Sequence, residues 1–343
     1  MEAQQTATLD PERSRALALA LQSGVPLVPD PWGELGAAIG APAYLVLDEI
    51  RAWERDGRLR EISAVIEGQA LGWDSALVAA AVPEARLEAV AEIVGACPTV
   101  THDYERRHAW NLWFTVAMPP EIGVDAALAV LGVETGLGDA FHALRRTHTF
   151  KIGVRFDPET MENTTASSAV APIVAGTLSP TERTLVRALQ TPLPYVPAPY
   201  DALARRFDTT EGALLSFARG ALGGLVRRYV GTFRHRKLGV GGNGMAVWDV
   251  PDERLAEVGA RLAEAPEVSH CYARNPASGF PFRLYSMIHA RDEAAVREIT
   301  TRLAAEVGVE RVEVLFSARE FKKQRLRYFT PELDQWWAAR RAS

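Results

Sequence analysis

The hydrophobic positions along the chain change from a helical period to a strand-like period, and the same succession occurs twice. Residues 11–23 and 180–190 each open a copy with helically spaced apolar residues. In residues 31–62, two short helical segments joined by a Gly/Pro turn lead into a longer helix that ends at Asp56 and Gly57, and a strand follows. This order predicts a winged helix-turn-helix at the start of each copy.

After each helix-turn-helix, the pattern becomes that of a ferredoxin-like βαββαβ domain. In the first copy it predicts strands at about 71–81, 99–104 and 111–118, an amphipathic helix between the first two, and a further helix and strand that close the unit. The second copy has the same elements at 244–250, 252–264, 267–273, 281–289, 292–306 and 310–316.

Two pairs of segments repeat at a constant offset of 168 residues. "ALQSGVPLVPDPW" (20–32) is echoed by "ALQTPLPYVPAPY" (188–200), and "VPEARLEAVAEIVGACPTVTHDYER" (82–106) is echoed by "VPDERLAEVGARLAEAPEVSHCYAR" (250–274). A constant offset indicates a tandem duplication or the fusion of two related subunits. The predicted fold is therefore α+β, a tandem duplication of a winged helix-turn-helix and a ferredoxin-like βαββαβ domain.

The same patterns predict the domain boundaries. They are 1–66 for the N-terminal helix-turn-helix, 67–157 for the first βαββαβ domain, 158–178 for a Thr-, Ser-, Ala- and Pro-rich linker, 179–233 for the second helix-turn-helix, 234–330 for the second βαββαβ domain and 331–343 for a C-terminal tail. The tail is predicted to form a short structural helix that docks through Trp336 and Trp337.

Composition excludes several classes of protein. The 343 residues are 48% hydrophobic and carry a formal net charge of -5, and no apolar run approaches the ~20 residues of a spanning helix. The polar, acidic start does not have the features of a signal peptide, so we expect a cytoplasmic protein that does not enter a membrane. The two cysteines, Cys97 and Cys271, are far apart and have no zinc-ligand spacing, and we expect them to be buried.

A helix-turn-helix followed by a βαββαβ domain resembles the Lrp/AsnC family of amino-acid-responsive transcription regulators. A recognition helix needs Arg, Lys, Asn or Gln for base edges and cations for phosphates. The helix in residues 41–57 balances Asp48, Glu49 and Glu54 against two arginines, and residues 208–224 offer little beyond Arg219. The residues therefore argue against DNA as a partner, and both helices are expected to pack.

Cations and aromatic residues gather instead in the βαββαβ segments. "THDYERRHAWNLWFT" (101–115) places His102, Arg106, Arg107 and His108 at a predicted hairpin before a strand with Trp113. "SHCYARNPASGFPFRLYS" (269–286) has His270, Arg274, Arg283 and Tyr285 at the corresponding place, and "FHALRRTHTFK" (141–151) adds cations between the last helix and last strand of the first copy. Flat apolar groups beside forked cations suit a large planar ligand with several carboxylates, such as a tetrapyrrole.

Structural roles are the competing interpretation of the same residues. An aromatic strand such as "WNLWF" is more often part of a core than a ligand wall, and paired arginines are usually solvated. The run "GVGGNG" (239–244) lacks the features of a P-loop or a Rossmann turn, and its simplest interpretation is a hairpin turn with Asn243–Gly244 at the corner. The recurrence of cations, histidines and aromatics at matching positions in both copies favours a functional role.

These motifs carry a resemblance to a known family. "ALGW" (70–73), the segment 101–115, "FRHRKLGVGGNGMAVW" (233–248) and "VSHCYARNPASGFPFRLY" (268–285) are similar to those of the siroheme decarboxylases, in the form that fuses both halves in one chain, from about Ser14 to Phe329. The resemblance implies removal of the C12 and C18 acetate carboxylates of siroheme, giving 12,18-didecarboxysiroheme for haem d1 or alternative haem biosynthesis. It implies no redox cofactor, since the iron belongs to the substrate, and it makes siroheme and other haem d1 biosynthesis proteins the expected partners.

The resemblance also implies roles for individual residues. His235 is the first candidate for general acid and His270 the second, as a proton donor or an axial contact to the siroheme iron. The expected substrate-binding residues are Arg234, Arg236, Lys237, Asn243, Arg274, Arg283 and Tyr285 in the second half and His102, Arg106, His108 and Trp113 in the first.

The first half departs from the family pattern, because Gln69 stands where a basic residue usually precedes "ALGY". One site, built largely from the second half, is therefore the preferred hypothesis. Sheet pairing in this architecture also predicts a homodimer. On the residues alone, a tetrapyrrole sensor without catalysis and a DNA-binding regulator remain as alternatives.

Overall fold

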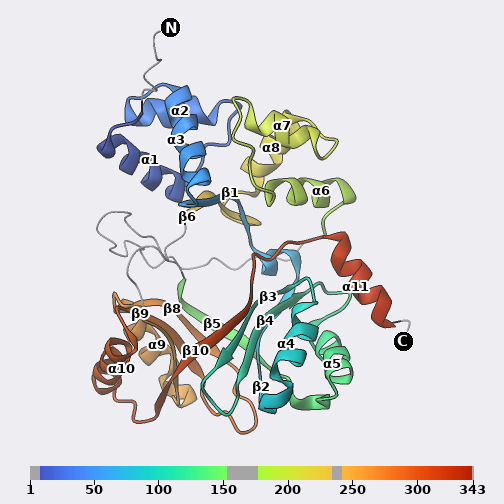
Figure 1. Cartoon of the computed structure of the whole chain (residues 1–343), viewed down its shortest axis with the longest axis vertical. Helices are drawn as coiled ribbons and strands as arrows, with labels where there is room; N and C mark the ends of the chain where they lie inside the picture. Colours follow the sequence, from blue (N-terminus) through green and yellow to red (C-terminus); the bar gives the residue numbers. More distant parts are fainter. Residues whose placement is uncertain (1–7, 153–176, 234–241, 342–343) are drawn as a thin grey trace. The chain divides into compact units, whose positions relative to one another are not determined.

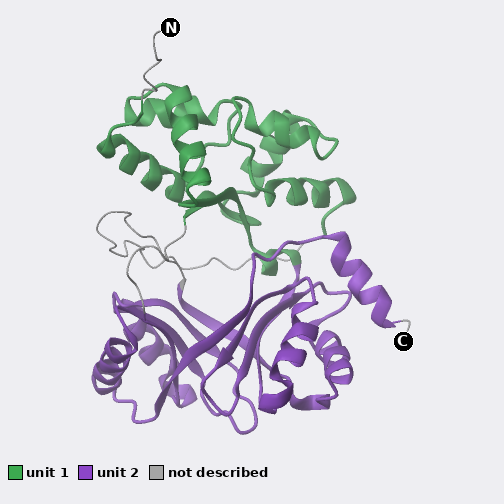
Figure 2. Cartoon of the chain, viewed as in Figure 1, with its two compact units in different colours: residues 1–71, 155–162, 173–237 green, residues 72–154, 163–172, 238–343 purple. Residues whose placement is uncertain are grey.

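The computed structural model describes residues 8–152, 177–233 and 242–341. The chain forms two compact units (Figure 2). Among the described residues, one unit contains both helix-turn-helix segments, residues 8–71 and 177–233, and the other contains both βαββαβ segments, residues 72–152 and 242–341. The two copies of the duplication are thus sorted by domain type rather than kept as two successive subunits.

The helical unit is built from two similar sets of three helices and one strand each. The first set is α1 (Pro11–Ser23), α2 (Pro31–Ile39), α3 (Ala43–Arg55) and β1 (Leu59–Ile66), and the second is α6 (Pro180–Leu189), α7 (Pro199–Arg205), α8 (Glu211–Ala221) and β6 (Val226–Phe233). Local signals define the helix starts: Asp10 caps α1, and Ser179 with Glu182 forms a capping box on α6.

The two sets share one hydrophobic core. Strands β1 and β6 pair antiparallel, and buried side chains of both sets belong to one cluster that includes Trp32, Ile50 and Tyr200. The polar atoms of the large aromatic residues also link the sets, since the Trp32 indole N–H donates to the carbonyl of Val196 at 2.7 Å. Both helix-turn-helix segments are therefore packed against each other, as their composition predicted.

The other unit is a closed barrel of eight strands flanked by helices (Figure 1). The first copy supplies β2 (Asp74–Ala80), β3 (Val100–Arg106), β4 (Leu112–Met118) and β5 (His142–Ile152), with α4 (Leu87–Gly95) and α5 (Val124–Thr135). The second supplies β7 (Gly242–Trp248), β8 (Val268–Arg274), β9 (Leu284–Ala290) and β10 (Val312–Lys323), with α9 (Leu255–Glu264) and α10 (Glu293–Val307). Helix α11 (Pro331–Arg341) follows, and short 3₁₀ turns occupy Gly68–Leu71, Glu84–Arg86, Gly138–Ala140 and Asp252–Arg254.

The last strand of each copy closes the barrel by pairing with the other copy. The strand order is β10-β3-β4-β2-β5-β8-β9-β7, so that β5 pairs with β8 and β10 pairs with β3. An apolar cluster with members from both copies, including Leu77, Trp113, Met245 and Tyr285, fills part of the space between the strands. The fold is α+β and a tandem duplication of the predicted domain types.

Two expectations about local structure are wrong. Residues 142–152 form β5 itself and do not precede the last strand of the first copy, and the Asn243–Gly244 pair lies inside β7 rather than at a hairpin corner. Gly244 is needed for close packing: a Cβ there would lie 2.7 Å from Cγ1 of Val296 and 2.8 Å from Cγ1 of Val314. Strand β10 also continues to Lys323, beyond the expected 310–316.

Candidate functional site

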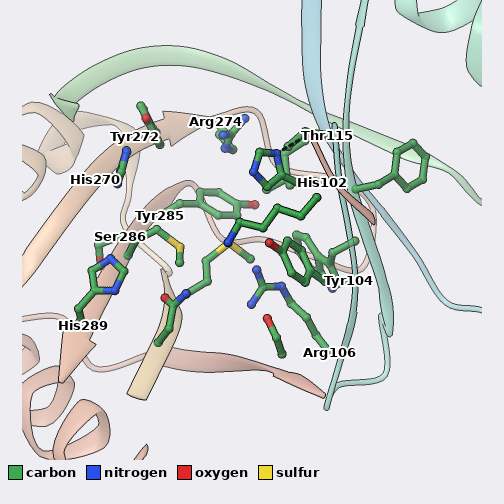
Figure 3. Close-up of a pocket in the computed structure, with 18 residues that line it drawn as sticks. His102, Tyr104, Arg106, Thr115, His270, Tyr272, Arg274, Tyr285, Ser286 and His289 are labelled. Carbon is green, nitrogen blue, oxygen red and sulfur yellow. Dashed lines mark hydrogen bonds between the residues drawn. The ribbon is translucent and has the colours of Figure 1, made fainter. Parts of the chain in front are cut away.

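Two three-residue sets on β3 and β8 define a pocket inside the barrel unit. His102, Tyr104 and Arg106 occupy alternate positions of β3, and their side chains therefore lie on one face of the strand. The same alternation on β8 gives His270, Tyr272 and Arg274, each 168 residues further along the chain. All six line one cavity of about 290 Å³ (Figure 3). The duplication thus produces two matching walls of one pocket.

The arginines of the two walls are buried and held in equivalent ways. Nη1 of Arg106 donates to the carbonyl of Leu315 at 2.7 Å, and Nη1 of Arg274 donates to the carbonyl of Leu144 at 2.9 Å. The Nε of each has no hydrogen-bond partner among the described residues. Burial lowers the pKa of each guanidinium to about 10, which leaves both cationic at neutral pH. No carboxylate within the described ranges forms an ion pair with either, so each retains donors for an anionic ligand.

Aromatic rings surround the two guanidiniums. The Arg274 guanidinium carbon lies 5.4 Å from the ring centre of Tyr272 and 5.6 Å from that of Tyr285, and the Arg106 carbon lies 5.8 Å from the Tyr104 ring. Trp113 and Tyr285 are almost fully buried and also line the cavity. Fixed cations beside flat apolar groups suit a planar ligand with carboxylate substituents.

The histidines of the two walls are each held by a hydroxyl from the preceding residue. Oγ1 of Thr101 lies 3.0 Å from Nδ1 of His102, and Oγ of Ser269 lies 2.9 Å from Nδ1 of His270. The Thr101 hydroxyl also contacts that of Thr115 at 2.7 Å. In both walls a hydroxyl thereby engages Nδ1 of the histidine, and in the second wall Nε2 of His270 is the ring nitrogen that could serve a ligand.

The environment of His270 favours the neutral imidazole. Burial, with smaller contributions from the nearby His289 and Lys151, lowers the pKa of His270 to about 4. The Lys151 ammonium is fixed by donation to the carbonyl of Ala265 at 2.9 Å. A neutral His270 can still donate one proton from Nε2, but it needs a source from which that proton is replaced.

Of the remaining residues predicted for the site, Asn243 lines the pocket and two others lie elsewhere. Nε2 of His108 lies 3.2 Å from Oε2 of Glu313, and the Arg283 guanidinium donates to Asp252 at 2.7 Å. Both side chains contact carboxylates outside the cavity and do not line it. Arg234, His235, Arg236 and Lys237 lie outside the described residues, and their roles stay predictions.

Several pocket residues were not among the predicted site residues. Tyr104 and Tyr272 repeat at the offset of 168 residues and were identifiable from that repetition. His289 and Lys323 had no such signal, because Ala117 and Ile152 occupy the corresponding places on β4 and β5. The other members of the lining are Leu77, Phe114, Thr115, Met245, Ser286, Met287 and Ser317.

Two features are absent from the described part of the chain. No group of three or more His, Cys, Asp or Glu residues is placed to hold a metal ion. No helix there is both long and apolar enough to cross a membrane.

The barrel and its pocket define an AsnC-like ligand-binding protein. The family model of the AsnC-like ligand binding domain matches residues 70–151 and 237–322, once in each copy. The family model of the siroheme decarboxylase NirDL-like helix-turn-helix domain matches residues 182–220.

Whole-chain relatives narrow this class. The chain is 34% identical to a siroheme decarboxylase of Hydrogenobacter thermophilus, over 92% of this chain and 95% of the relative. It is 30% identical to a siroheme decarboxylase NirDL subunit of Paracoccus denitrificans, over 88% of this chain and 93% of that one. The crystal structure of the siroheme decarboxylase NirDL in co-complex with an iron-uroporphyrin III analogue matches with a TM-score of 0.80 and 29% identity, over 96% of this chain and 99% of that one. The chain belongs to the siroheme decarboxylase family.

Proposed function

We propose that this protein is a carboxy-lyase that removes the C12 and C18 acetate carboxylates of siroheme as carbon dioxide, giving 12,18-didecarboxysiroheme. The product would enter haem d1 or alternative haem biosynthesis. Family membership supports the proposal, and so does the iron-uroporphyrin III analogue bound by the NirDL structure. The observation that carries it is the pair Arg106 and Arg274, two buried guanidiniums with no carboxylate partner among the described residues, on facing walls of one pocket.

The two arginines would select and hold the substrate. Siroheme carries carboxylates that must remain as well as the two that leave, and a fixed guanidinium binds a carboxylate through two parallel hydrogen bonds. The rings of Trp113 and Tyr285 would pack against the macrocycle, and Asn243 would add a polar contact at the pocket wall. An acetate that enters the apolar part of the pocket loses the solvation of its carboxylate, which favours release of neutral carbon dioxide while the electron pair of the broken bond is delocalised into the pyrrole.

Histidines would supply the protons that the reaction consumes. After carbon dioxide leaves, the remaining carbon must be protonated, and an imidazole at the pocket wall is suited to this step. His270 is the candidate within the described residues, and His235 is the candidate from the segment outside them. His102 would contact the substrate from the first half.

The other expectations follow from the same proposal. No redox cofactor is needed, since the decarboxylation is non-oxidative and the iron is part of the substrate. Other haem d1 biosynthesis proteins as partners, a homodimer and a cytoplasmic location stay predictions from the sequence.

The family relationship does not favour a DNA-binding regulator, and contacts in the helical unit agree with this. One arginine of each recognition-type helix donates to a backbone carbonyl: Arg51 Nε to that of Tyr195 at 3.0 Å, and Arg219 Nη1 to that of Leu27 at 3.0 Å. They therefore have fewer donors left for a DNA backbone.

The test is anaerobic incubation of the purified protein with siroheme, followed by mass spectrometry of the extracted tetrapyrrole. A product lighter by two carbon dioxide units is expected, together with its loss in His235→Ala. Siroheme that binds, with a shifted Soret band, but is recovered unchanged would contradict the proposal and identify a tetrapyrrole sensor.

A further inference from the structure

The two walls of the pocket differ in the second hydrogen-bond partner of the hydroxyl that contacts each histidine. In the second half, Oγ of Ser269 lies 2.9 Å from Nδ1 of His270 and 2.7 Å from Nε2 of His289. One hydroxyl therefore joins two imidazoles, and both imidazoles line the cavity (Figure 3). His289 is on β9, the strand that pairs with β8 and β7, and it is less buried than its neighbour Ile288.

The first half lacks the second imidazole. Val116 pairs with Val100 as Ile288 pairs with Val268, so that Ala117 occupies the place of His289. The Thr101 hydroxyl, which corresponds to that of Ser269, contacts His102 and Thr115 instead. The duplicated pocket thus has a His–Thr–Thr chain on one wall and a His–Ser–His chain on the other.

The proposed reaction requires a proton for every carboxylate removed. Its balance is R–CH₂–CO₂⁻ + H⁺ → R–CH₃ + CO₂: the bond between the methylene carbon and the carboxylate carbon breaks, and its electron pair, delocalised into the pyrrole, forms the new C–H bond. Two such steps on one substrate consume two protons. A buried, neutral imidazole holds only one proton that it can donate at Nε2.

We propose that Ser269 and His289 form a proton relay that resupplies His270 during decarboxylation. This inference rests on the proposed function. When Nε2 of His270 gives its proton to the substrate carbon, the Ser269 hydroxyl gives its own to Nδ1 of His270 and receives one from Nε2 of His289. A protonated His289 thereby becomes neutral, and His270 carries its proton on Nδ1. Uptake of a proton from water at Nε2 then reverses the two transfers, which restores the Nε2–H tautomer of His270 and the proton of His289 before the second step.

The surroundings of His270 suit transfer rather than storage of charge. Lys151 on β5 and His289 on β9 are the charged or titratable groups that lower the pKa of His270 beyond the effect of burial. Because both disfavour a cation at His270, a path in which His270 exchanges one tautomer for the other avoids an unfavourable intermediate. The single hydroxyl of Ser269 is in hydrogen-bond range of both rings, as such a concerted exchange needs.

The test compares His289→Gln and His289→Ala with the unaltered protein in single-turnover decarboxylation of siroheme, followed by mass spectrometry. Glutamine is close to histidine in volume and can form hydrogen bonds, but it cannot transfer a proton. Alanine is the residue at the equivalent position, 117, in the first half. His148→Ala, on the exposed part of β5, is the control histidine. We expect both His289 variants to bind siroheme with unchanged Soret titrations and to lose about 10- to 100-fold in rate at saturating substrate. Added imidazole should restore the rate of His289→Ala.

Serine variants and heavy water extend the test. Ser269→Ala should be as slow as His289→Ala. Ser269→Thr should keep most of the rate, because the hydroxyl of Thr101 makes the equivalent contact with Nδ1 of His102. The solvent deuterium isotope effect should change only when the relay is broken. Full rates in both His289 variants, or slow rates that imidazole does not restore and that leave the isotope effect unchanged, would overturn the relay. Failure of the unaltered protein to decarboxylate siroheme would instead contradict the proposed function.

Discussion

Asp103 and Lys322 face each other across the antiparallel pair of β3 and β10, yet the carboxylate and the ammonium are not hydrogen-bonded to each other. Nζ of Lys322 donates to the carbonyls of Gly95 and Cys97, at 2.5 and 2.8 Å. Neither carboxylate oxygen of Asp103 has a hydrogen-bond partner among the described residues. Burial raises the pKa of Asp103 to about 7, and the charge of Lys322 opposes this only in part. The second copy has no buried carboxylate at this position, because Cys271 is the residue paired with Lys151.

Asp103 should therefore make the protein less stable as the pH rises. A carboxyl group with a folded pKa above its unfolded value contributes stability that is complete below pH ~4 and is lost as the pH increases to about 7. Asp103→Asn should remove this loss and raise the free energy of unfolding at pH 8 by on the order of 1–3 kcal/mol relative to the unaltered protein. Chemical denaturation at pH 5 and pH 8 measures it. Glu121→Gln, at an exposed site, is the control, and an equal pH dependence in Asp103→Asn and the unaltered protein would refute the assignment.

The two buried arginines should control affinity for the substrate. Arg274→Met removes a guanidinium that is fixed by its hydrogen bond to the carbonyl of Leu144. It should weaken siroheme binding by about 10- to 100-fold, because a charge-assisted hydrogen-bonded pair is lost. Arg106→Met should have a comparable effect from the other wall. Soret titration gives the affinity, and Arg283→Met, which affects only the ion pair with Asp252, provides the matched control. Unchanged affinity in both pocket variants would mean that the carboxylates bind elsewhere.

Substitutions of the two histidines on the facing walls should have different kinetic effects, one on substrate binding and the other on turnover. His102 has no second imidazole behind it, so His102→Ala should raise KM and leave kcat within about three-fold. His270→Ala should lower kcat by about 100-fold or more, because it removes the proton donor itself. Steady-state decarboxylation rates over a range of siroheme concentrations separate the two effects. A larger fall in kcat for His102→Ala than for His270→Ala would reverse the assignment of the walls.

The packing of the two copies against each other should depend on Gly259. A Cβ at this position of α9 would lie 2.4 Å from ring atoms of Phe150, which comes from β5 of the first copy. Gly259→Val should therefore force the ring away and destabilise the protein by about 1–3 kcal/mol. Thermal unfolding measures the change. Phe150→Leu should recover part of the stability in the double variant, and a loss unaffected by Phe150→Leu would place the clash elsewhere.

The sequence by itself determined the duplication, most of the order of helices and strands, and the histidines and arginines of β3 and β8 that line the pocket. Local physics explains this success: helix caps, turn residues and the strand period of two act over a few neighbours, and the offset of 168 residues relates His102 to His270 without any structure.

The tertiary structure alone decided which residues meet. The pairing of β5 with β8 and of β10 with β3 joins the two copies and brings both walls into one pocket, and long-range strand pairing leaves no local signal in the chain. For the same reason, the contact of Ser269 with His289 was not visible in the sequence. Arg283 and His108 are of residue types that suit the site, but they contact carboxylates outside the pocket. Residue type and spacing predict a strand face, but only the closed barrel determines what that face encloses.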